Sequence, residues 1–402
     1  MAITGVGIVS CLGTGVDKVA YALQAGKTGI GIDPQRKELG FRSALTGIIS
    51  DFTPPPLDRK KRRTMTEFGL QCYAAALEAI DMAGWEAGEI ASDRTGLIVG
   101  NDSSTVACCQ QVDTTRREGS TLPIGSGLVF QALNSTVTMN LNTLLGNRGA
   151  SWSLSAACAS GGHAVGQASD LIAFGRQDRM ICGGVQEITW ESVASFDATN
   201  AFSIRQDDPE RALRPFDAQR DGLVPSGGAA IVALERYDLA KRRGATILGF
   251  IHAYAFSSDG ANLAVPSPDG LERCMRECLM RTETHPSAID YVCAHATSTP
   301  VGDAVEAQAI HRVFGDGCPW VSSTKSMTGH EMWMAGASQV VYSVIMGREG
   351  FIAPNKNFTR QEDGVPRLRI AAETIDARPR LILCNAAGFG GTNSSLLIGM
   401  DS

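Results

Sequence analysis

Residues 153–163 read Ser153-Leu154-Ser155-Ala156-Ala157-Cys158-Ala159-Ser160-Gly161-Gly162-His163. The small and branched residues before Cys158 predict a buried strand over 151–157, and the apolar residues after Gly162 recur at helical spacing as far as Gly175. Cys158 is therefore expected where a strand turns into a helix. The unpaired N–H groups and the positive dipole end of that helix favour a thiolate, which makes Cys158 a candidate nucleophile. The alternative is a buried, inert cysteine.

The size and composition of the chain narrow the possible classes of function. Its 402 residues exceed the roughly 250–300 at which a single core stops growing, so two domains or one duplicated unit are expected. A net charge of −6 argues against general nucleic-acid binding. The N-terminus does not resemble a signal peptide, and no apolar run approaches the ~20 residues of a membrane span. The 11 cysteines lack secreted or zinc-site spacing, which indicates a reducing cytoplasm and no metal site.

The order of the predicted elements indicates α/β architecture in two similar halves. Strands and helices alternate along the whole chain, as in α/β proteins. The strand, turn and helix around Cys158 are mirrored by residues 320–346. We therefore expect one half over residues 1–235, which carries Cys158, and a second half over residues 236–402.

Two histidines and a lysine occupy positions similar to that of Cys158. His295 ends an expected buried strand, while Lys325 and His330 lie just before an expected helix over 331–346. Functional residues of doubly wound α/β folds gather at the carboxyl ends of strands. A single histidine is more often structural, but a cysteine, two histidines and a lysine at such positions favour catalysis.

Four motifs together resemble those of the β-ketoacyl-acyl-carrier-protein synthases. They are, in order, Ala157-Cys158-Ala159, His295-x-Thr-Ser-Thr-Pro-Val-Gly-Asp303, Thr324-Lys325-Ser326-Met327-Thr328-Gly329-His330 and Gly388-Phe389-Gly390-Gly391-Thr392-Asn393. The resemblance covers essentially the whole chain and is closest to the bacterial type I enzyme. It implies the thiolase fold, with two similar halves in a five-layer α-β-α-β-α sandwich that usually forms a homodimer.

The resemblance implies a decarboxylative condensation that elongates a fatty-acid or polyene-like chain. Cys158 would carry the acyl chain as a thioester, and the backbone N–H groups of Cys158 and Phe389 would stabilise the oxyanion. Phe389 also matches the gate of the family. His295 and His330 would hold the malonyl thioester carbonyl and the enolate formed from it, and Lys325 would orient its loop and add positive potential.

Further residues match supporting positions of the family. Glu306 corresponds to a buried acid near the lysine, although Asp303-x-x-Glu306 also resembles a capping box that opens a helix. Thr297 and Thr299 would bind the phosphopantetheine arm of an acyl carrier protein. The carrier would bring both substrates, and no cofactor would be bound to the chain itself.

One dense run of positive charge is a candidate docking site for that carrier. Arg59, Lys60 and Arg63 match basic positions that bind the acidic carrier protein in the type I enzyme. A solvated loop or helix start is the alternative for such a run. The resemblance implies a homodimer, or a heterodimer with a partner similar to a chain-length factor in a specialised polyene or polyketide pathway.

The chain departs from the family in three places. Ala296 replaces a glycine, Trp333 and Met334 add bulk after the second histidine, and Ala387 replaces a phenylalanine. Trp333 is expected to compensate for the ring lost at Ala387, unless it packs outward and the two changes are unrelated.

Two alternative functions can be compared with the residues present. A non-catalytic partner subunit would lack the nucleophile, whereas Cys158 and both histidines are present. A Cys–His hydrolase explains Cys158 and one histidine, but neither Lys325 nor the second histidine. The sequence leaves open the preferred chain length and the pathway.

Overall fold

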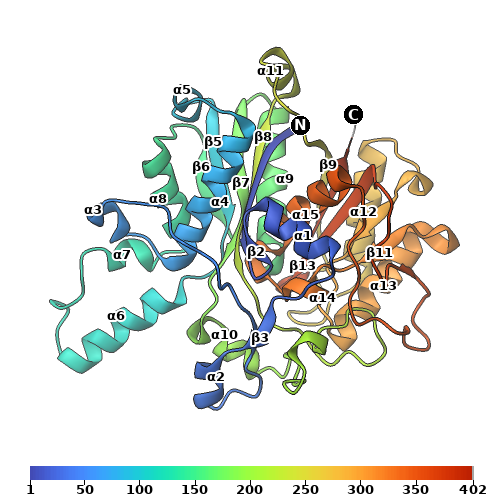
Figure 1. The fold of residues 1–402 in the computed structure, drawn as a ribbon, viewed down its shortest axis with the longest axis horizontal. Coiled ribbons are helices and arrows are strands. Elements are labelled where there is room, and N and C mark those ends of the chain that lie inside the picture. Colours follow the sequence, from blue (N-terminus) through green and yellow to red (C-terminus); the bar gives the residue numbers. More distant parts are fainter. Residues whose placement is uncertain (401–402) are drawn as a thin grey trace.

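A computed structural model describes residues 1–400 and shows a mixed α/β architecture (Figure 1). The strands of the first half are β1 (Ala2–Ser10), β2 (Gly13–Thr14), β3 (Ile30–Ile32), β4 (Leu45–Gly47), β5 (Thr95–Gly100), β6 (Ser151–Leu154), β7 (Arg179–Gln186) and β8 (Gly228–Glu235). The strands of the second half are β9 (Gly249–Ser258), β10 (Tyr291–Cys293), β11 (Trp320–Ser322), β12 (Arg369–Ile370), β13 (Leu381–Gly388) and β14 (Thr392–Gly399).

Helices connect these strands in both halves. The first half contains α1 (Val16–Gln24), α2 (Pro34–Glu38), α3 (Arg59–Arg62), α4 (Glu67–Ala83), α5 (Ala87–Ile90), α6 (Thr105–Glu118), α7 (Leu128–Gln131), α8 (Thr136–Leu145), α9 (Ser160–Ala173) and α10 (Trp190–Asp197). The second half contains α11 (Tyr237–Arg242), α12 (Pro268–Arg281), α13 (Pro300–Phe314), α14 (Lys325–Thr328) and α15 (Ala335–Glu349). None of the helices within residues 1–400 is both long and apolar enough to cross a bilayer.

The same strand order occurs twice. In the first half the order is β6-β5-β7-β8-β1, with β6, β5 and β7 parallel and the next two pairings antiparallel. In the second half β11-β10-β13-β14-β9 repeats this order and these directions, with β12 added at the edge. A short antiparallel contact between β1 and β9 joins the two sets of strands. The expected boundary between residues 235 and 236 falls in the connection between the repeats, because β8 ends at Glu235.

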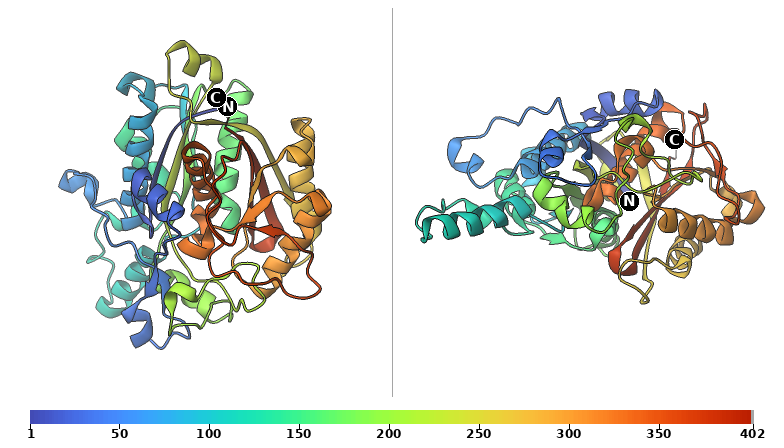
Figure 2. Two further views of the ribbon diagram at one scale, coloured as in Figure 1. Left: turned by 45° about the vertical axis from the view of Figure 1, so that its right-hand side comes forward. Right: turned by 90° about the horizontal axis from the view of Figure 1, so that it is seen from below.

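The elements are arranged in the five layers implied by the resemblance. Helix α4 packs on the outer face of β1 and β8, and α12 packs on the outer face of β9 and β14. Helices α9 and α15 contact each other and strands of both halves, so they form the middle layer. Figures 1 and 2 show the first half, blue to green, beside the second half, yellow to red, with α9 and α15 between them.

Local sequence explains the tight layers. A Cβ atom on Gly5 would lie only 2.0 Å from the Ala79 carbonyl oxygen, so glycine lets β1 pack directly against α4. Thr66 caps the start of α4, and Gly84 ends it with a φ of 65°. Residues 335–347 of α15 are all buried, which fits a helix enclosed on every side by the two sheets.

The predicted elements are present, with shifted ends at the turns. The strand expected over 151–157 stops at Leu154 and is not buried as predicted, because it lies at the sheet edge, where Ser151 and Trp152 are exposed. The helix expected over 331–346 is a 3-10 turn (Met332–Met334) followed by α15. Residues 101–148 contain the helices α6, α7 and α8, and α6 projects from the body (Figures 1 and 2).

Candidate active site

Cys158 lies in a 3-10 turn (Ala157–Ala159) between strand β6 and helix α9. Ala157 has a φ of 46°, an unfavourable value for a residue with a Cβ atom. The turn is held by side chains at both ends. The Ala157 N–H donates to Asp102 Oδ2 (3.0 Å), and the Ser160 hydroxyl accepts from the Ala156 N–H (2.8 Å) and donates to the Ala157 carbonyl (2.6 Å). This arrangement fixes Cys158 at the start of the middle-layer helix.

The thiol of Cys158 is protonated in the free protein. Burial raises its pKa to about 12, and the positive charge of Lys325 only partly opposes this, while Asp102 adds to the rise. The prediction of a thiolate is therefore wrong for the unliganded site, because burial raises the pKa of this thiol more than Lys325 and the backbone hydrogen bond lower it.

His295 and His330 face each other beside the nucleophile. Their ring centroids are 5.3 Å apart and the rings are nearly perpendicular, at 87°. Burial and the nearby Lys325 lower the pKa of both imidazoles well below the usual range, so both rings are neutral. Within residues 1–400 neither Nδ1 atom has a hydrogen-bond partner. The backbone of His330 is bound to the first half, because its N–H donates to the Val224 carbonyl (2.7 Å).

Glu306 holds the backbone that carries His295. Its carboxylate accepts from the N–H groups of His295 (2.9 Å) and Ala296 (2.6 Å). The capping-box alternative is wrong, since α13 begins at Pro300 and both acids lie inside it. Asp303 instead accepts from the Ser298 N–H (3.1 Å) and the Phe216 N–H (2.8 Å).

Lys325 is a buried cation surrounded by acidic groups. Its Nζ atom has no hydrogen-bond partner within residues 1–400. Burial lowers its pKa, while the nearby Cys293, Glu306 and Glu331 oppose that shift. Such an ammonium supplies positive potential to its neighbours without being fixed to one of them.

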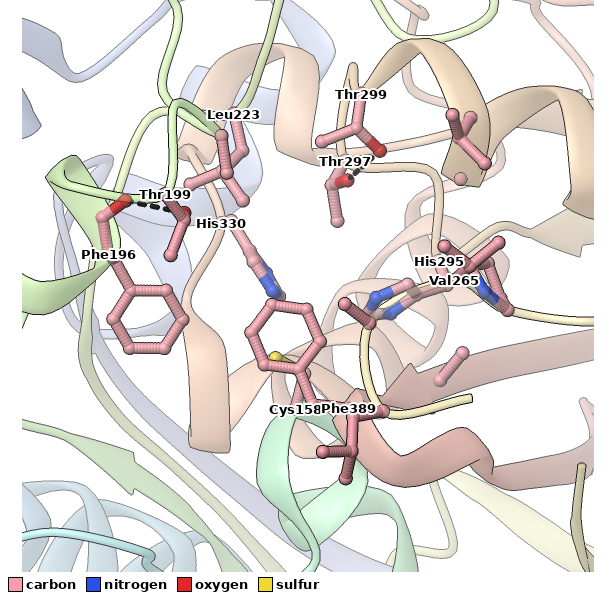
Figure 3. A pocket seen from close by; sticks show the side chains of 18 of the residues that line it. Cys158, Phe196, Thr199, Leu223, Val265, His295, Thr297, Thr299, His330 and Phe389 are labelled. Atoms are coloured by element: carbon pink, nitrogen blue, oxygen red, sulfur yellow. Dashed lines mark hydrogen bonds between the residues drawn. The ribbon is translucent and has the colours of Figure 1, made fainter. Parts of the chain in front are cut away.

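A cavity of about 440 Å³ leads to these groups. Cys158, His295 and His330 line it together with Thr297 and Thr299, whose hydroxyls are 3.1 Å apart. Figure 3 shows both histidines and the cysteine directed toward the middle of the cavity. Of the predicted catalytic and pantetheine-binding residues, Cys158, His295, His330, Thr297 and Thr299 thus share one cavity, whereas Lys325 is buried nearby and does not line it.

Phe389 lies at the cavity wall beside the nucleophile turn. It opens a 3-10 turn (Phe389–Gly391) after β13, and its side chain is 47% exposed. The preceding Gly388 allows the close approach, because a Cβ atom there would lie 2.8 Å from the Ala156 carbonyl oxygen. The Phe389 ring stacks on Phe196 of α10, with centroids 5.8 Å apart and an angle of 14° (Figure 3).

Comparison with known proteins agrees with this geometry. The model of the β-ketoacyl synthase N-terminal domain matches residues 1–240, and that of the C-terminal domain matches residues 248–359. The chain belongs to the β-ketoacyl synthase family. A curated relative, 3-oxoacyl-[acyl-carrier-protein] synthase 1 of Haemophilus influenzae, is 39% identical over 402 residues, which is 98% of this chain and 97% of the relative. The members of this family are acyl-transferring condensing enzymes.

Solved ketosynthase structures share the fold along the whole chain. A β-ketoacyl synthase from Burkholderia phymatum has a TM-score of 0.95 at 34% identity, covering 100% of this chain and 99% of that one. The ishigamide ketosynthase/chain length factor has a TM-score of 0.91 at 27% identity, with the same coverage. The thiolase-like fold predicted from the motifs is therefore confirmed.

The basic residues predicted to dock a ketosynthase's carrier lie apart from the cavity wall. Arg59 and Lys60 are in the short exposed helix α3, and Arg63 follows it. The side chain of Asp58 caps this helix by accepting from the N–H groups of Lys60 and Lys61 at 3.0 Å each. The run is thus both a capped helix start and an exposed group of cations.

Two of the departures from the family, Trp333 and Ala387, have different surroundings. The Trp333 indole donates to Ser103 Oγ (3.0 Å) and lies 6.3 Å from the Phe196 ring, whereas Ala387 lines the cavity itself. Compensation between Trp333 and Ala387 stays a prediction.

Three site residues were not found from the sequence. Asp102 binds the nucleophile turn, Phe196 stacks on Phe389, and Glu331 is a buried carboxyl beside Lys325. Only Glu331 carried a usable signal, as a lone acid in the otherwise apolar run Glu331–Gly336. Within residues 1–400 no cluster of three or more His, Cys, Asp or Glu side chains is arranged to hold a metal ion.

Proposed function

We propose that this chain is a β-ketoacyl-acyl-carrier-protein synthase that condenses an acyl chain on Cys158 with a malonyl unit. The observation that carries the proposal is the single cavity in which a buried cysteine meets two neutral histidines, with a buried lysine close by. A hydrolase needs one base beside its nucleophile, whereas two neutral N–H donors suit the enolate of a condensation.

The first half-reaction transfers the acyl group. Cys158 Sγ attacks the carbonyl carbon of an acyl-carrier thioester, the bond from that carbon to the carrier sulfur breaks, and the thiol proton passes to the departing carrier thiol. The backbone N–H groups of Cys158 and Phe389 stabilise the tetrahedral oxyanion. Both open toward the cavity from short 3-10 turns, where first-turn N–H groups lack helical acceptors.

The second half-reaction forms the carbon–carbon bond. The malonyl carboxylate leaves as CO2, and its bonding electrons pass into an enolate whose oxygen accepts N–H bonds from His295 and His330. The enolate carbon attacks the acyl carbonyl on Cys158, the carbon–sulfur bond breaks, and the thiolate takes up a proton. Lys325 supports the negative charge through its potential, and Glu306 positions His295 through the backbone.

The remaining assignments concern how the substrate arrives. Thr297 and Thr299 line the cavity with hydroxyls that can bind the amides of a phosphopantetheine arm. Phe389 acts as a gate that shields Cys158 until the acyl chain is loaded. The substrates travel on the arm of an acyl carrier protein, and no bound cofactor is required by this chemistry.

The proposed partners are an acidic carrier protein and a second subunit. Arg59, Lys60 and Arg63 present positive charge on and beside α3 for the carrier. Strand β6 lies at the edge of its sheet, and its Trp152 is 40% exposed beside Leu133 in one surface hollow. A second copy that pairs along β6 would cover this edge and its apolar residues. The free thiol nucleophile requires a reducing compartment, so we place the enzyme in the cytoplasm.

A second candidate is the catalytic subunit of a specialised ketosynthase pair. The likeness to the ishigamide ketosynthase/chain length factor, at a TM-score of 0.91, favours it. In that case the β6 edge would pair with a different chain rather than with a copy.

One assay tests the function directly. Purified protein is incubated with malonyl carrier alone, with acyl carrier alone, and with both. We expect an acyl adduct on Cys158 by mass spectrometry, CO2 release, and a 3-oxoacyl carrier product only when both substrates are present. Hydrolysis of the acyl carrier without CO2 release would instead identify a hydrolase. No reaction without an added partner chain, and activity with one, would identify the specialised pair.

A further inference from the structure

The nucleophile has two different sides. On one side Cys158 faces the cavity with His295, His330, Thr297 and Thr299, the groups that the proposed function assigns to the malonyl thioester and its arm. On the other side Cys158 packs in a buried apolar group, which we call the Cys158 cluster, consisting of Cys158, Val193, Phe202, Leu223, Met332 and Trp333. Leu223 and Met332 also line the cavity, whereas Val193, Phe202 and Trp333 do not. An acyl chain on Cys158 that leaves the first side free for malonyl must extend toward this cluster.

Trp333 is the largest side chain in the Cys158 cluster. It is only 8% exposed, and its indole spans the space between two elements of the first half. Its Nε1 donates to Ser103 Oγ (3.0 Å) in the loop before α6, and its ring lies 6.3 Å from Phe196 of α10 at an angle of 54°. The indole therefore fills the apolar space into which an acyl chain would grow.

The backbone that carries the Trp333 indole has little room to move away from the Cys158 cluster. Two glycines of the first half touch the 3-10 turn Met332–Met334. A Cβ atom on Gly161 would lie 3.0 Å from the Trp333 carbonyl oxygen, and one on Gly184 would lie 2.8 Å from the Met334 Cα. Met332 is held at a φ of 44°. The turn is thus packed closely against α9 and β7, so the backbone has little room to move away and a rotation of the indole is the smaller change that would open the space.

The loop that holds the indole is itself bound to the nucleophile turn. Asp102, next to Ser103, accepts from the Ala157 N–H (3.0 Å), and its carbonyl accepts from Asn134 Nδ2 (3.2 Å). Rotation of Trp333 would break its bond to Ser103 and leave a buried N–H without an acceptor, which is costly.

We propose that Trp333 limits the length of the acyl group that Cys158 accepts, so that this enzyme works on short acyl chains. The inference rests on the proposed function, since it concerns the acyl group of that reaction. A short acyl group fits between the sulfur and the indole, whereas a longer chain must displace an anchored ring in a packed cluster.

The test is the rate of Cys158 acylation as a function of chain length. Wild-type protein and Trp333→Ala are each incubated with acetyl, butyryl, octanoyl and dodecanoyl carrier, and adducts are followed by intact-protein mass spectrometry. For the wild type we expect dodecanoyl transfer to be slower than butyryl transfer by at least about tenfold, because a single misfit methylene already costs on the order of tenfold. In Trp333→Ala that ratio should fall by about tenfold or more.

Two further variants separate a length limit from general damage. Met334→Ala removes a buried side chain from the same turn, but Met334 packs in the central core rather than in the Cys158 cluster, so its length profile should stay that of the wild type. Trp333→Leu keeps an apolar side chain of smaller size, should show an intermediate profile, and provides the test if Trp333→Ala does not fold.

The possible failures are distinguishable. If the wild type accepts dodecanoyl as readily as butyryl, or if the folded Trp333 variants keep the wild-type profile, the length limit is refuted while the synthase function stands. If Met334→Ala shifts the profile as Trp333→Ala does, the effect is structural and the inference fails. If no carrier acylates Cys158 at any length, the proposed function fails and this inference fails with it.

Discussion

Cys158 combines a high thiol pKa with a position in the proposed active site. The thiolate must therefore be stabilised in the substrate complex, because the free site does not stabilise it. Burial raises the pKa to about 12, and Lys325 opposes that rise. We expect Cys158→Ala to abolish the acyl adduct and condensation while malonyl decarboxylation continues, because the histidine pair remains. Measurement of the 3-oxoacyl product and of CO2 in parallel checks this. A variant that still elongates acyl chains would show that the nucleophile lies elsewhere.

The two histidines should matter for decarboxylation more than for acyl transfer. Each is a neutral N–H donor in the same cavity, and the loss of one preorganised donor costs about 10²–10³ in rate. We expect His295→Ala and His330→Ala to slow CO2 release by that factor while Cys158 is still acylated. A histidine whose replacement leaves condensation near the wild-type rate has no part in the mechanism.

Glu331 gives the protein a pH-dependent stability. Burial raises its pKa to about 7 from an ordinary 4.5, against hydrogen bonds from Ser338 and Tyr342 and the charge of Lys325. Between these two values the unfolded carboxyl has lost its proton and the folded one keeps it. The folded state then binds more protons, so this contribution is present in full below about pH 4.5 and is lost as the pH rises to about 7.

Replacement of Glu331 by a group that does not titrate should remove this contribution. We expect the melting temperature of Glu331→Gln, relative to that of the wild type, to rise between about pH 4.5 and 7 and then to level off. Thermal unfolding at a series of pH values measures it. Glu306 is unchanged in both proteins, so its own titration cancels in the comparison. A constant difference across the range would contradict the assignment.

At the residue scale, the sequence identified the site residues that lie at turns. It missed the site residues that act through contacts between segments distant in the chain. Cys158 and His330 were predictable because a change of pattern marks where each lies. Asp102 and Phe196 act through contacts with residues more distant in the chain, Ala157 and Phe389, which no local pattern reports. The thiol's protonation state was missed for a related reason, since burial is a property of the packed molecule.

At the scale of elements, helix α3 is the feature most clearly separable from catalysis. Its cations are exposed, and it lies apart from the cavity wall. We expect the double change Arg59→Glu and Arg63→Glu to raise KM for carrier-bound substrates by at least about tenfold and to flatten its dependence on salt. Steady-state kinetics at several ionic strengths checks this. Activity on a small pantetheine thioester serves as the control, and an equal loss on both substrates would indicate misfolding.

The long helices were predicted to within a few residues, because caps and periodicity specify them locally. Thr66 and Gly84 bound α4, and Gly175, the expected end of the helix after Cys158, lies just beyond the end of α9. The errors fall at the two 3-10 turns beside the site, over 157–159 and 332–334. There Ala157 and Met332 adopt positive φ values that only the surrounding packing can impose, so helical periodicity gave no warning.

At the scale of the molecule, the duplication explains why the site contains residues from both halves. Cys158 follows β6 and Lys325 follows β11, which occupy equivalent places in the two repeats. The middle-layer helices that begin after these strands pack on each other, so the two strand ends converge. Weak self-similarity in the sequence predicted the repeat, but not that a short contact between β1 and β9 would join the two sets of strands.

The two repeats differ at the edges of their sheets, and this difference concerns how subunits could assemble. In the second half β12 covers the edge strand β11, whereas in the first half the equivalent strand β6 has no outer neighbour within residues 1–400. Trp152 of β6 is 40% exposed, and the arm that contains α6 and α7 displays Leu122 at 92% and Phe130 at 46% (Figure 1). An edge strand with apolar neighbours is unfavourable in water and favours a covering subunit.

We therefore expect the isolated chain to be a dimer that pairs along β6. Trp152→Glu places a charge in that contact and should halve the mass measured by sedimentation equilibrium at micromolar concentration. Tyr237→Glu provides the matched control, because Tyr237 is an aromatic residue of similar exposure, 47%, on helix α11. A wild-type monomer that becomes a complex only with a second, different chain would favour the specialised pair. If Trp152→Glu remains dimeric, the subunits meet on another face and the β6 edge must be covered in some other way.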